Sequence, residues 1–171
     1  MPTRIRRAFG LLLLAGTLGG LVGCSGPHDT AATSYSARDQ RGSAVSLADL
    51  RGRPALLTSW ATWCHNCKTL LPGLQALAEE QGRSGLHVVA VNVNAGGSGG
   101  EVAALERDYG MTMPRWRDTD DDFTHTFRAR GVPTSVLLDA NGRVVQQWPG
   151  GIPLDDPAVT RLITRLVEQA S

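Results

Sequence analysis

Two cysteines separated by two residues, Cys64 and Cys67, stand at a change of periodicity in the chain. Residues 55–60 (Ala-Leu-Leu-Thr-Ser-Trp) form a short apolar run typical of a buried strand, whereas the apolar residues from 70 to 78 recur at helical spacing. A helix is therefore predicted to begin near Cys64 and to end at residues 81–82 (Gln-Gly). This order places both cysteines in the first turn of a helix that follows a strand, which favours an α/β fold.

The spacing of this pair is typical of thiol-disulfide exchange. Exchange needs one thiolate that attacks and a second thiol close enough to resolve the mixed disulfide. At the start of a helix, unpaired backbone N–H groups and the helix dipole stabilise negative charge, so Cys64 is predicted to be the nucleophile. Cys67 lies one turn further in and is predicted to be the more shielded, resolving thiol. A disulfide across so short a loop adds little chain-entropy stabilisation, which favours reactivity over architecture as the reason for the pair.

The amino terminus has the order of a secretory signal, with three arginines in the first seven residues, an apolar run over residues 8–22 and small residues at its end. The run is shorter than the roughly 20 residues of a bilayer-spanning helix. Its end, Leu-Val-Gly-Cys at residues 21–24, resembles the lipobox of bacterial lipoproteins. That resemblance implies a signal peptide over residues 1–23 and a lipid on Cys24 that anchors the protein to the extracytoplasmic side of a bacterial membrane. A plain signal peptide with an incidental Cys24, or an uncleaved anchor, is the alternative.

Charge and composition argue against a nucleic-acid partner. The chain carries 17 Lys and Arg against 16 Asp and Glu, and three of the arginines lie within residues 1–23, where there is no acid. Without that segment the chain is slightly acidic. It also lacks a basic patch with interleaved aromatic residues, which is the pattern that binds phosphate backbones.

Residues 24–36 are small and polar, and are predicted to be a flexible tether in front of a single folded domain over residues 37–171. Within the domain, the patterns predict further strands at 86–93, 114–117, 135–138 and 144–148, and further helices at 101–109, 120–128 and 155–170. The strand at 86–93 is apolar at nearly every position and is predicted to be central. Asn141-Gly142 predicts a hairpin at a sheet edge. The expected fold is α/β, with a mixed central sheet covered by helices on both faces.

Two motifs carry a family resemblance. They are Trp-Ala-Thr-Trp-Cys-His-Asn-Cys-Lys at residues 60–68, followed by Leu71-Pro72, and Gly-Val-Pro-Thr at residues 131–134. Over about residues 36–171 the chain resembles proteins of the thioredoxin fold, specifically the membrane-anchored TlpA/ResA-like thiol-disulfide oxidoreductases of bacteria.

The resemblance implies that Trp63, Val132 and Pro133 contact the substrate, and that the bond before Pro133 is cis, which is a minority state for X-Pro bonds. It also implies a reductase that takes electrons from a membrane donor of thiol-disulfide type. The expected substrates are exported proteins with cysteine pairs, such as apocytochrome c. The redox-active Cys64–Cys67 disulfide is expected to serve without a further cofactor or metal.

Two family acids are missing from the chain. Thr58 stands where many thioredoxins have a buried acid, and Leu70 stands where many TlpA/ResA-like proteins have a glutamate. Deprotonation of Cys67 must then use water, His65 or an acid that the sequence does not identify.

The residues between the two cysteines, His65-Asn66, also depart from the Gly-Pro of typical thioredoxins. An imidazole beside a thiolate favours the anion, so we expect the pKa of Cys64 to lie below the value of about 8.5 for free cysteine. The reduction potential is then expected to be less negative than the roughly −270 mV of thioredoxin. A solvated His65 with little influence is the alternative interpretation.

Other functions on the same fold stay open. A disulfide oxidase would use the same two cysteines to take electrons from its substrate, and an isomerase would transfer electrons in both directions. A non-catalytic metal-binding or chaperone module would use the fold without turnover, although structural zinc usually needs four protein ligands. The remaining histidines, His28, His87 and His125, are scattered in the sequence and suggest no second ligand pair.

Overall fold

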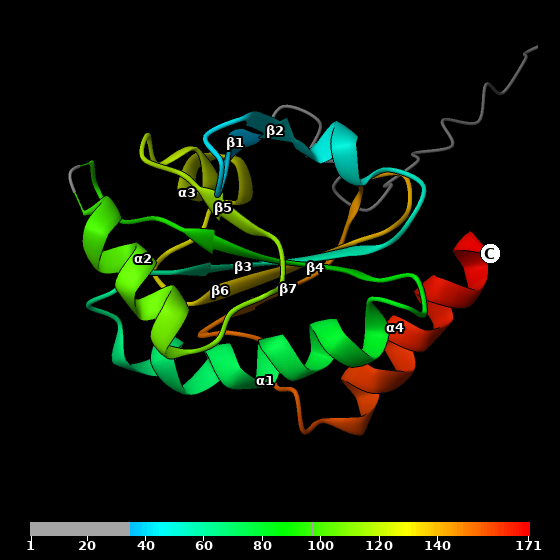
Figure 1. Ribbon diagram of the computed structural model, residues 1–171. Coiled ribbons are helices and arrows are strands. Elements are labelled where there is room, and N and C mark those ends of the chain that lie inside the picture. Colours follow the sequence, from blue (N-terminus) through cyan, green and yellow to red (C-terminus); the bar gives the residue numbers. More distant parts are fainter. Residues whose placement is uncertain (1–34, 97) are drawn as a thin grey trace, which may run out of the picture.

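The computed structural model describes residues 35–96 and 98–171 (Figure 1). The predicted signal peptide over residues 1–23, the predicted lipid attachment at Cys24 and the predicted tether up to residue 34 lie outside the described residues. In chain order the elements are β1 (Ser36–Asp39), β2 (Ala44–Ser46), a 3-10 helix (Leu47–Leu50), β3 (Ala55–Trp60), α1 (His65–Gln81), β4 (His87–Asn92), α2 (Gly99–Asp108), β5 (Arg115–Arg117), α3 (Asp122–Phe127), β6 (Thr134–Leu138), β7 (Val144–Pro149) and α4 (Pro157–Ala170).

The strands form one mixed sheet of seven, in the order β2-β1-β5-β4-β3-β6-β7. β4 pairs in parallel with both β3 and β5, whereas β6 runs antiparallel to β3 and to β7. β4 is therefore the central strand and β7 an edge strand, which confirms both predictions. The predicted hairpin is also confirmed, because β6 and β7 are joined by a turn in which the Gly142 N–H donates to the Asp139 carbonyl at 3.0 Å.

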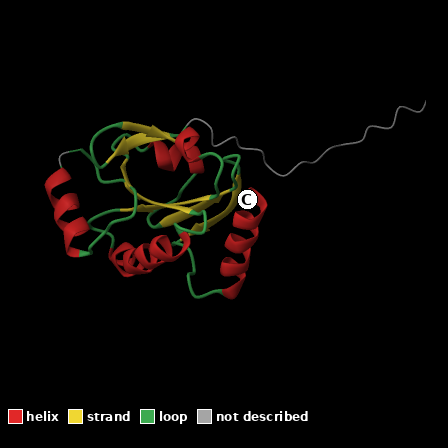
Figure 2. Ribbon diagram, turned by 45° about the vertical axis from the view of Figure 1, so that its right-hand side comes forward, coloured by secondary structure: helices red, strands yellow, loops and turns green. Residues whose placement is uncertain are grey.

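Helices cover both faces of the sheet, as predicted, because successive side chains of the central strands point to opposite faces. From β3, Leu56 joins the core cluster that contains Cys64 and Cys67, whereas Leu57 joins a second cluster on the other face. Figure 1 shows α1 and α4 on one side of the sheet and α3 on the other, and Figure 2 shows the same layers after a turn of 45°. No helix within the described ranges is long and apolar enough to cross a membrane.

The predicted boundary between tether and domain, after residue 36, is wrong by two residues. Tyr35 is fully buried and its ring contacts those of Trp116, Phe123 and Phe127, while β1 begins at Ser36. A single tyrosine among small polar residues shows no periodicity in the sequence, yet one large aromatic ring buries enough area to attach the segment to the core. Tyr35 and Ser36 therefore belong to the folded domain.

Tyr35 predicts a pH dependence of stability. Burial raises the pKa of Tyr35 well above its ordinary value of about 10, and the charge of Asp118, which accepts a hydrogen bond from the tyrosine hydroxyl at 3.4 Å, raises it further. Above pH 10 the unfolded chain loses this proton and the folded protein keeps it. The stabilisation from Tyr35 is thus present below pH 10 and declines above it, by up to about 1.4 kcal/mol per pH unit.

Denaturant unfolding of the protein and of Tyr35→Phe between pH 9 and 11 measures this effect. The variant cannot lose the proton, so its free energy of unfolding is expected to fall less steeply with pH than that of the unsubstituted protein. A constant difference between the two proteins over this pH range would contradict the prediction.

Candidate active site

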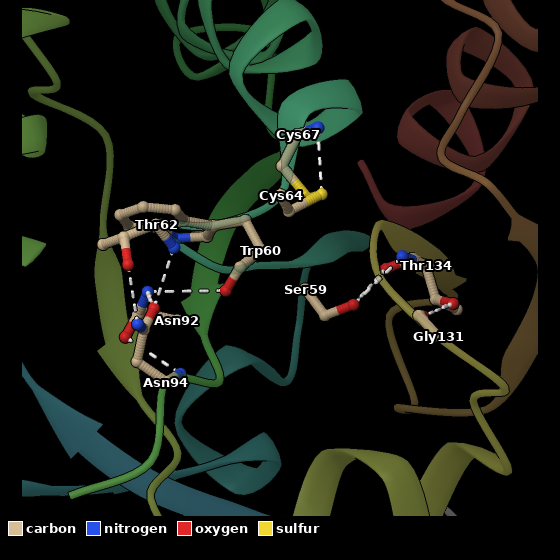
Figure 3. Close-up of a disulfide and its surroundings, with 9 residues drawn as sticks. All are labelled: Ser59, Trp60, Thr62, Cys64, Cys67, Asn92, Asn94, Gly131 and Thr134. Carbon is tan, nitrogen blue, oxygen red and sulfur yellow. Dashed lines mark hydrogen bonds between the residues drawn. A yellow bond between two sulfur atoms is a disulfide. The ribbon is translucent and has the colours of Figure 1, made fainter. Parts of the chain in front are cut away.

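The two cysteines of the motif form a disulfide at the start of α1, with 2.07 Å between the sulfurs and 5.3 Å between the Cα atoms (Figure 3). Cys64 has an extended backbone and is the N-cap of the helix, so its side chain lies against the unpaired N–H groups of the first turn. The N–H of Cys67 donates a hydrogen bond to Cys64 Sγ at 3.1 Å. The predicted placement of the pair at a helix start is confirmed.

The two sulfur-bearing residues differ in access to solvent. Cys64 is 6% exposed and Cys67 is 1% exposed, so the pair is approached from the side of Cys64. This order agrees with the predicted roles of Cys64 as attacking and Cys67 as shielded thiol. In a reduced pair, the N–H that contacts Cys64 Sγ and the positive end of the helix dipole would both stabilise a Cys64 thiolate.

Trp63, immediately before the first cysteine, is 71% exposed, whereas Trp60 and Trp116 are buried. Burying an aromatic ring of this size is strongly favourable, and an indole also offers an N–H donor. The indole of Trp63 lies exposed to solvent beside the disulfide, and its contact with a substrate stays a prediction.

The loop before β6 brings the second motif to the same core. The Val132–Pro133 bond is cis, as the family resemblance implied, and Val132 packs against the cluster that contains Cys64 and Cys67. Pro133 is buried, while the neighbouring Gly131 is exposed. The structure thus packs Val132 against the core around the disulfide, with Pro133 buried next to it in the chain.

The two positions that lack family acids hold well-packed side chains. The hydroxyl of Thr58 shares a hydrogen bond of 2.8 Å with that of Ser135, and Ser135 Oγ also accepts from the Ile152 N–H at 3.0 Å. Leu70 and the ring of Pro133 both lie close to Gly151, since a Cβ built on Gly151 would lie 2.6 Å from Leu70 Cδ2 and 3.2 Å from Pro133 Cγ. Thr58 therefore forms a hydrogen bond within the sheet and Leu70 packs beside the β7–α4 loop, and the predicted proton acceptor for Cys67 is still water, His65 or an acid that the sequence does not identify.

His65 is exposed at the first helical position of α1, and the described part of the chain offers no hydrogen-bond partner for its imidazole. Its effect on Cys64 stays a prediction. No group of three or more His, Cys, Asp and Glu side chains among the residues described is arranged to hold a metal ion.

Polar residues on both sides of the disulfide were missed by the sequence analysis. On one side, Asn92 and Asn94 contact the turn before Cys64, and on the other side Ser59 contacts Thr134, the residue after Pro133 (Figure 3). The available signal was the presence of polar residues in otherwise apolar strands. Their partners could not be assigned without the strand register.

Ser59 anchors the loop that carries the cis bond. Its Oγ accepts from the Thr134 N–H at 3.0 Å and donates to the Thr134 carbonyl at 3.3 Å, and the Thr134 hydroxyl closes the loop by donating to the Gly131 carbonyl at 2.7 Å. Ser59→Ala would leave the buried N–H of Thr134 without this partner. We expect a loss of about 2 kcal/mol in the free energy of unfolding, measured by urea denaturation.

A matched control for Ser59→Ala is Ser98→Ala, since the hydroxyl of Ser98 makes one hydrogen bond, to the Ala95 carbonyl, and does not bind the N–H groups of α2. That variant is expected to change stability by less than about 0.5 kcal/mol. Equal losses in the two variants would contradict an anchoring role for Ser59.

Comparison with known proteins agrees with this geometry. The AhpC/TSA family matches residues 29–147 of the chain. The thiol-disulfide oxidoreductase ResA of Oceanobacillus iheyensis is 31% identical over 113 residues, which are 66% of this chain and only 58% of that protein. ResA of Geobacillus kaustophilus is 30% identical over 125 residues, covering 73% of this chain and 71% of that protein.

A solved structure shows the same architecture. A crystal structure of a protein assigned as thiol:disulfide interchange protein DsbE from Chlorobium tepidum has a TM-score of 0.70 and 27% sequence identity to this chain. The match covers 78% of this chain and 92% of that one. The α/β thioredoxin-like fold with its CxxC pair is therefore shared with thiol-disulfide oxidoreductases.

Proposed function

We propose that this chain, which belongs to the AhpC/TSA family and is a homologue of the ResA thiol-disulfide oxidoreductases, reduces disulfide bonds in exported proteins through Cys64 and Cys67. One observation carries the proposal: the two cysteines form a disulfide at the N-terminus of α1, with Cys64 as the helix cap and the more exposed of the two. A helix start of this kind lowers the pKa of a thiol and prepares it for attack.

The reaction is a pair of exchange steps. The Cys64 thiolate attacks one sulfur of the substrate disulfide, so that the substrate S–S bond breaks, a mixed disulfide forms and the other substrate sulfur leaves as a thiolate that takes up a proton. The deprotonated Cys67 then attacks Cys64 Sγ, which releases the second substrate thiolate and closes the Cys64–Cys67 disulfide. Two electrons pass from the dithiol to the substrate. A dithiol donor at the membrane restores the reduced pair by the same exchange, with no further cofactor.

Three residues beside the pair are suited to hold the substrate chain. Trp63 offers an exposed aromatic face next to Cys64, and Val132 and Pro133 form the loop that packs against the same core. An extended substrate segment with an apolar residue near its cysteine would bury part of the indole while its sulfur approaches Cys64. This contact supports substrates that are unfolded or partly folded when their disulfides are reduced.

The place of action follows from the amino-terminal sequence. Cleavage of residues 1–23 and lipid attachment to Cys24 would anchor the domain to the extracytoplasmic side of a bacterial membrane, on a tether that ends before Tyr35. In cells, Cys24→Ala is expected to release the protein from the membrane fraction. Retention of the variant with the membranes would favour an uncleaved anchor.

The equilibrium of the Cys64–Cys67 pair with glutathione tests the proposed direction. A stabilised thiolate predicts a reduction potential less negative than the roughly −270 mV of thioredoxin, and a reductase role predicts one far more negative than the roughly −120 mV of DsbA. The same protein should accelerate the reduction of insulin by dithiothreitol. A potential near that of DsbA would favour the oxidase alternative, and no exchange with any dithiol or disulfide would count against an oxidoreductase.

The contribution of His65 can be measured separately. His65 occupies the first position of α1, where proline is well tolerated because its N–H has no partner within the helix. His65→Pro therefore removes the imidazole and keeps the helix. We expect the pKa of the Cys64 thiol in the reduced protein, followed by thiolate absorbance, to rise in this variant. An unchanged value would exclude an effect of His65 on that pKa.

A further inference from the structure

The side chain of Asn94, just beyond the end of β4, holds the turn that carries Trp63 and Cys64 (Figure 3). Asn94 Oδ1 accepts a hydrogen bond from the backbone N–H of Thr62 at 2.9 Å, and Asn94 Nδ2 donates to the hydroxyl of Thr62 at 2.8 Å. One amide group thus binds Thr62 at two points. We call this pair of hydrogen bonds the Asn94–Thr62 clamp.

A second asparagine fixes the orientation of the first. Asn92 Nδ2 donates to Asn94 Oδ1 at 2.8 Å and to the Trp60 carbonyl at 3.4 Å, while Asn92 Oδ1 accepts from the Asn94 N–H at 3.3 Å. The two asparagines are 2% and 6% exposed. Buried amides have no water to replace lost partners, so the network has one favoured arrangement and holds Thr62 firmly.

The clamp acts on a short segment between β3 and α1. In this segment the Cys64 N–H donates to the Ala61 carbonyl at 3.1 Å, which closes a turn with Thr62 and Trp63 at its centre. The turn leads directly into Cys64, so its conformation determines the extended backbone of Cys64. That backbone in turn determines where Sγ lies over the first turn of α1. Of the two central residues, Trp63 is exposed, which leaves Thr62 as the point at which the turn is attached.

We infer that Asn94 is a positioning residue for the reactive sulfur: by binding Thr62 at two points, it keeps Cys64 Sγ within reach of the Cys67 N–H and the helix dipole. The inference rests on the proposed function, since it concerns the same reactive thiol. Without the clamp the turn samples other conformations, and the thiolate spends part of its time away from the charges that stabilise it.

The rate of alkylation of reduced Cys64 as a function of pH tests this inference, because the midpoint of the profile is the pKa of the attacking thiol. We expect Asn94→Ala to raise that pKa by roughly one unit, toward the value of about 8.5 for free cysteine. At a pH below both values, the thiolate fraction and the alkylation rate then fall about tenfold.

Thr62 provides a second pair of variants that keeps the test decisive if Asn94→Ala fails to fold. Thr62→Val removes the hydroxyl that accepts from Asn94 Nδ2 and keeps the backbone N–H that donates to Asn94 Oδ1. Because one of the two hydrogen bonds remains, we expect the pKa of Cys64 to rise by about half as much as in Asn94→Ala. Thr62→Ser retains the hydroxyl and should restore the unsubstituted profile. Equal profiles for the valine and serine variants would overturn the inference.

Gln75→Ala is the matched control for the loss of a buried amide. Gln75 ties α1 to the segment before β5, since its Oε1 accepts from the Thr112 and Met113 N–H groups at 2.9 and 3.2 Å. It lies eight residues beyond Cys67, or about 12 Å along the helix. Gln75→Ala should lower the unfolding midpoint and leave the alkylation profile in place. The inference fails if Asn94→Ala destabilises the protein in the same way without moving the profile.

Alkylation requires no protein substrate, so this experiment separates the inference from the proposed function. An unsubstituted protein that never reduces insulin would count against the proposed function, while the comparison of Asn94→Ala with Gln75→Ala would still decide the role of the clamp.

Discussion

Replacing Cys64 with serine is expected to reduce the catalysed rate of insulin reduction to that of dithiothreitol alone. A serine hydroxyl is not ionised near neutral pH and cannot displace sulfur from a disulfide, so the first exchange step is lost. Cys67 cannot take over that step, because it is 1% exposed and lies inside the first turn of α1, behind the capping residue. The measurement is the turbidity of reduced insulin over time.

Replacing Cys67 with serine is expected to give a different outcome. Cys64 can still attack, but no second thiol resolves the product, so the protein should accumulate as a mixed disulfide with its substrate. Non-reducing gels would show an adduct that dithiothreitol dissolves. If the adduct instead forms with Cys64→Ser, the assignment of attacking and resolving thiols is reversed.

Neither variant should unfold the domain, so the loss of activity can be attributed to chemistry. The stabilisation from a disulfide grows with the length of the loop that it closes, and this loop spans only Cys64 to Cys67. Circular dichroism of the variants checks this point. Cys24→Ser is the control for thiol removal, and it should retain full activity in a soluble assay because Cys24 precedes the folded domain.

Features that depend on local sequence were predicted correctly. The change from the apolar run of β3 to helical spacing located α1 and its cysteines, and the apolar run at β4 identified the central strand. Asn141-Gly142 located the β6–β7 turn, in which Gly142 has a φ of +80°, a backbone conformation that favours glycine. In each case the signal lies within about ten residues of the element that it specifies.

Apart from the Val132–Pro133 loop, which the family resemblance placed at the site, the contacts between distant segments were not predicted. Ser59 meets Thr134 only because β3 pairs with β6 in one particular register, and Asn94 meets Thr62 only because β4 lies beside β3. Tyr35 joins the core through rings that lie more than 80 residues away. A polar or isolated aromatic residue has no periodicity, so its partner becomes known only from the tertiary structure.

The β7–α4 loop contains a further contact of this kind, at Gly151. We expect Gly151→Ala to lower the free energy of unfolding by about 3 kcal/mol, and Gly150→Ala by only about 1–2 kcal/mol. Both glycines have positive φ, of +96° and +88°, so alanine strains the backbone at either position. A Cβ at Gly150 meets nothing within 4 Å, whereas one at Gly151 meets Leu70 Cδ2 at 2.6 Å and Pro133 Cγ at 3.2 Å.

Gly150→Ala therefore measures the backbone strain alone, and the difference between the two variants measures the contact. A Cβ at residue 151 contacts two side chains, Leu70 and Pro133. The end of the Leu70 side chain can rotate away from it, whereas the ring of Pro133 cannot. Adding Leu70→Ala to Gly151→Ala removes the contact with Leu70, so we expect the double variant to be more stable than the sum of the single losses predicts, by about 1 kcal/mol. If Gly151→Ala in the Leu70→Ala background still lowers the free energy of unfolding by more than Gly150→Ala does, that difference measures the steric contact between a Cβ at residue 151 and the ring of Pro133. Additive losses would show that Leu70 and residue 151 do not interact, and urea unfolding of the four variants decides between these outcomes.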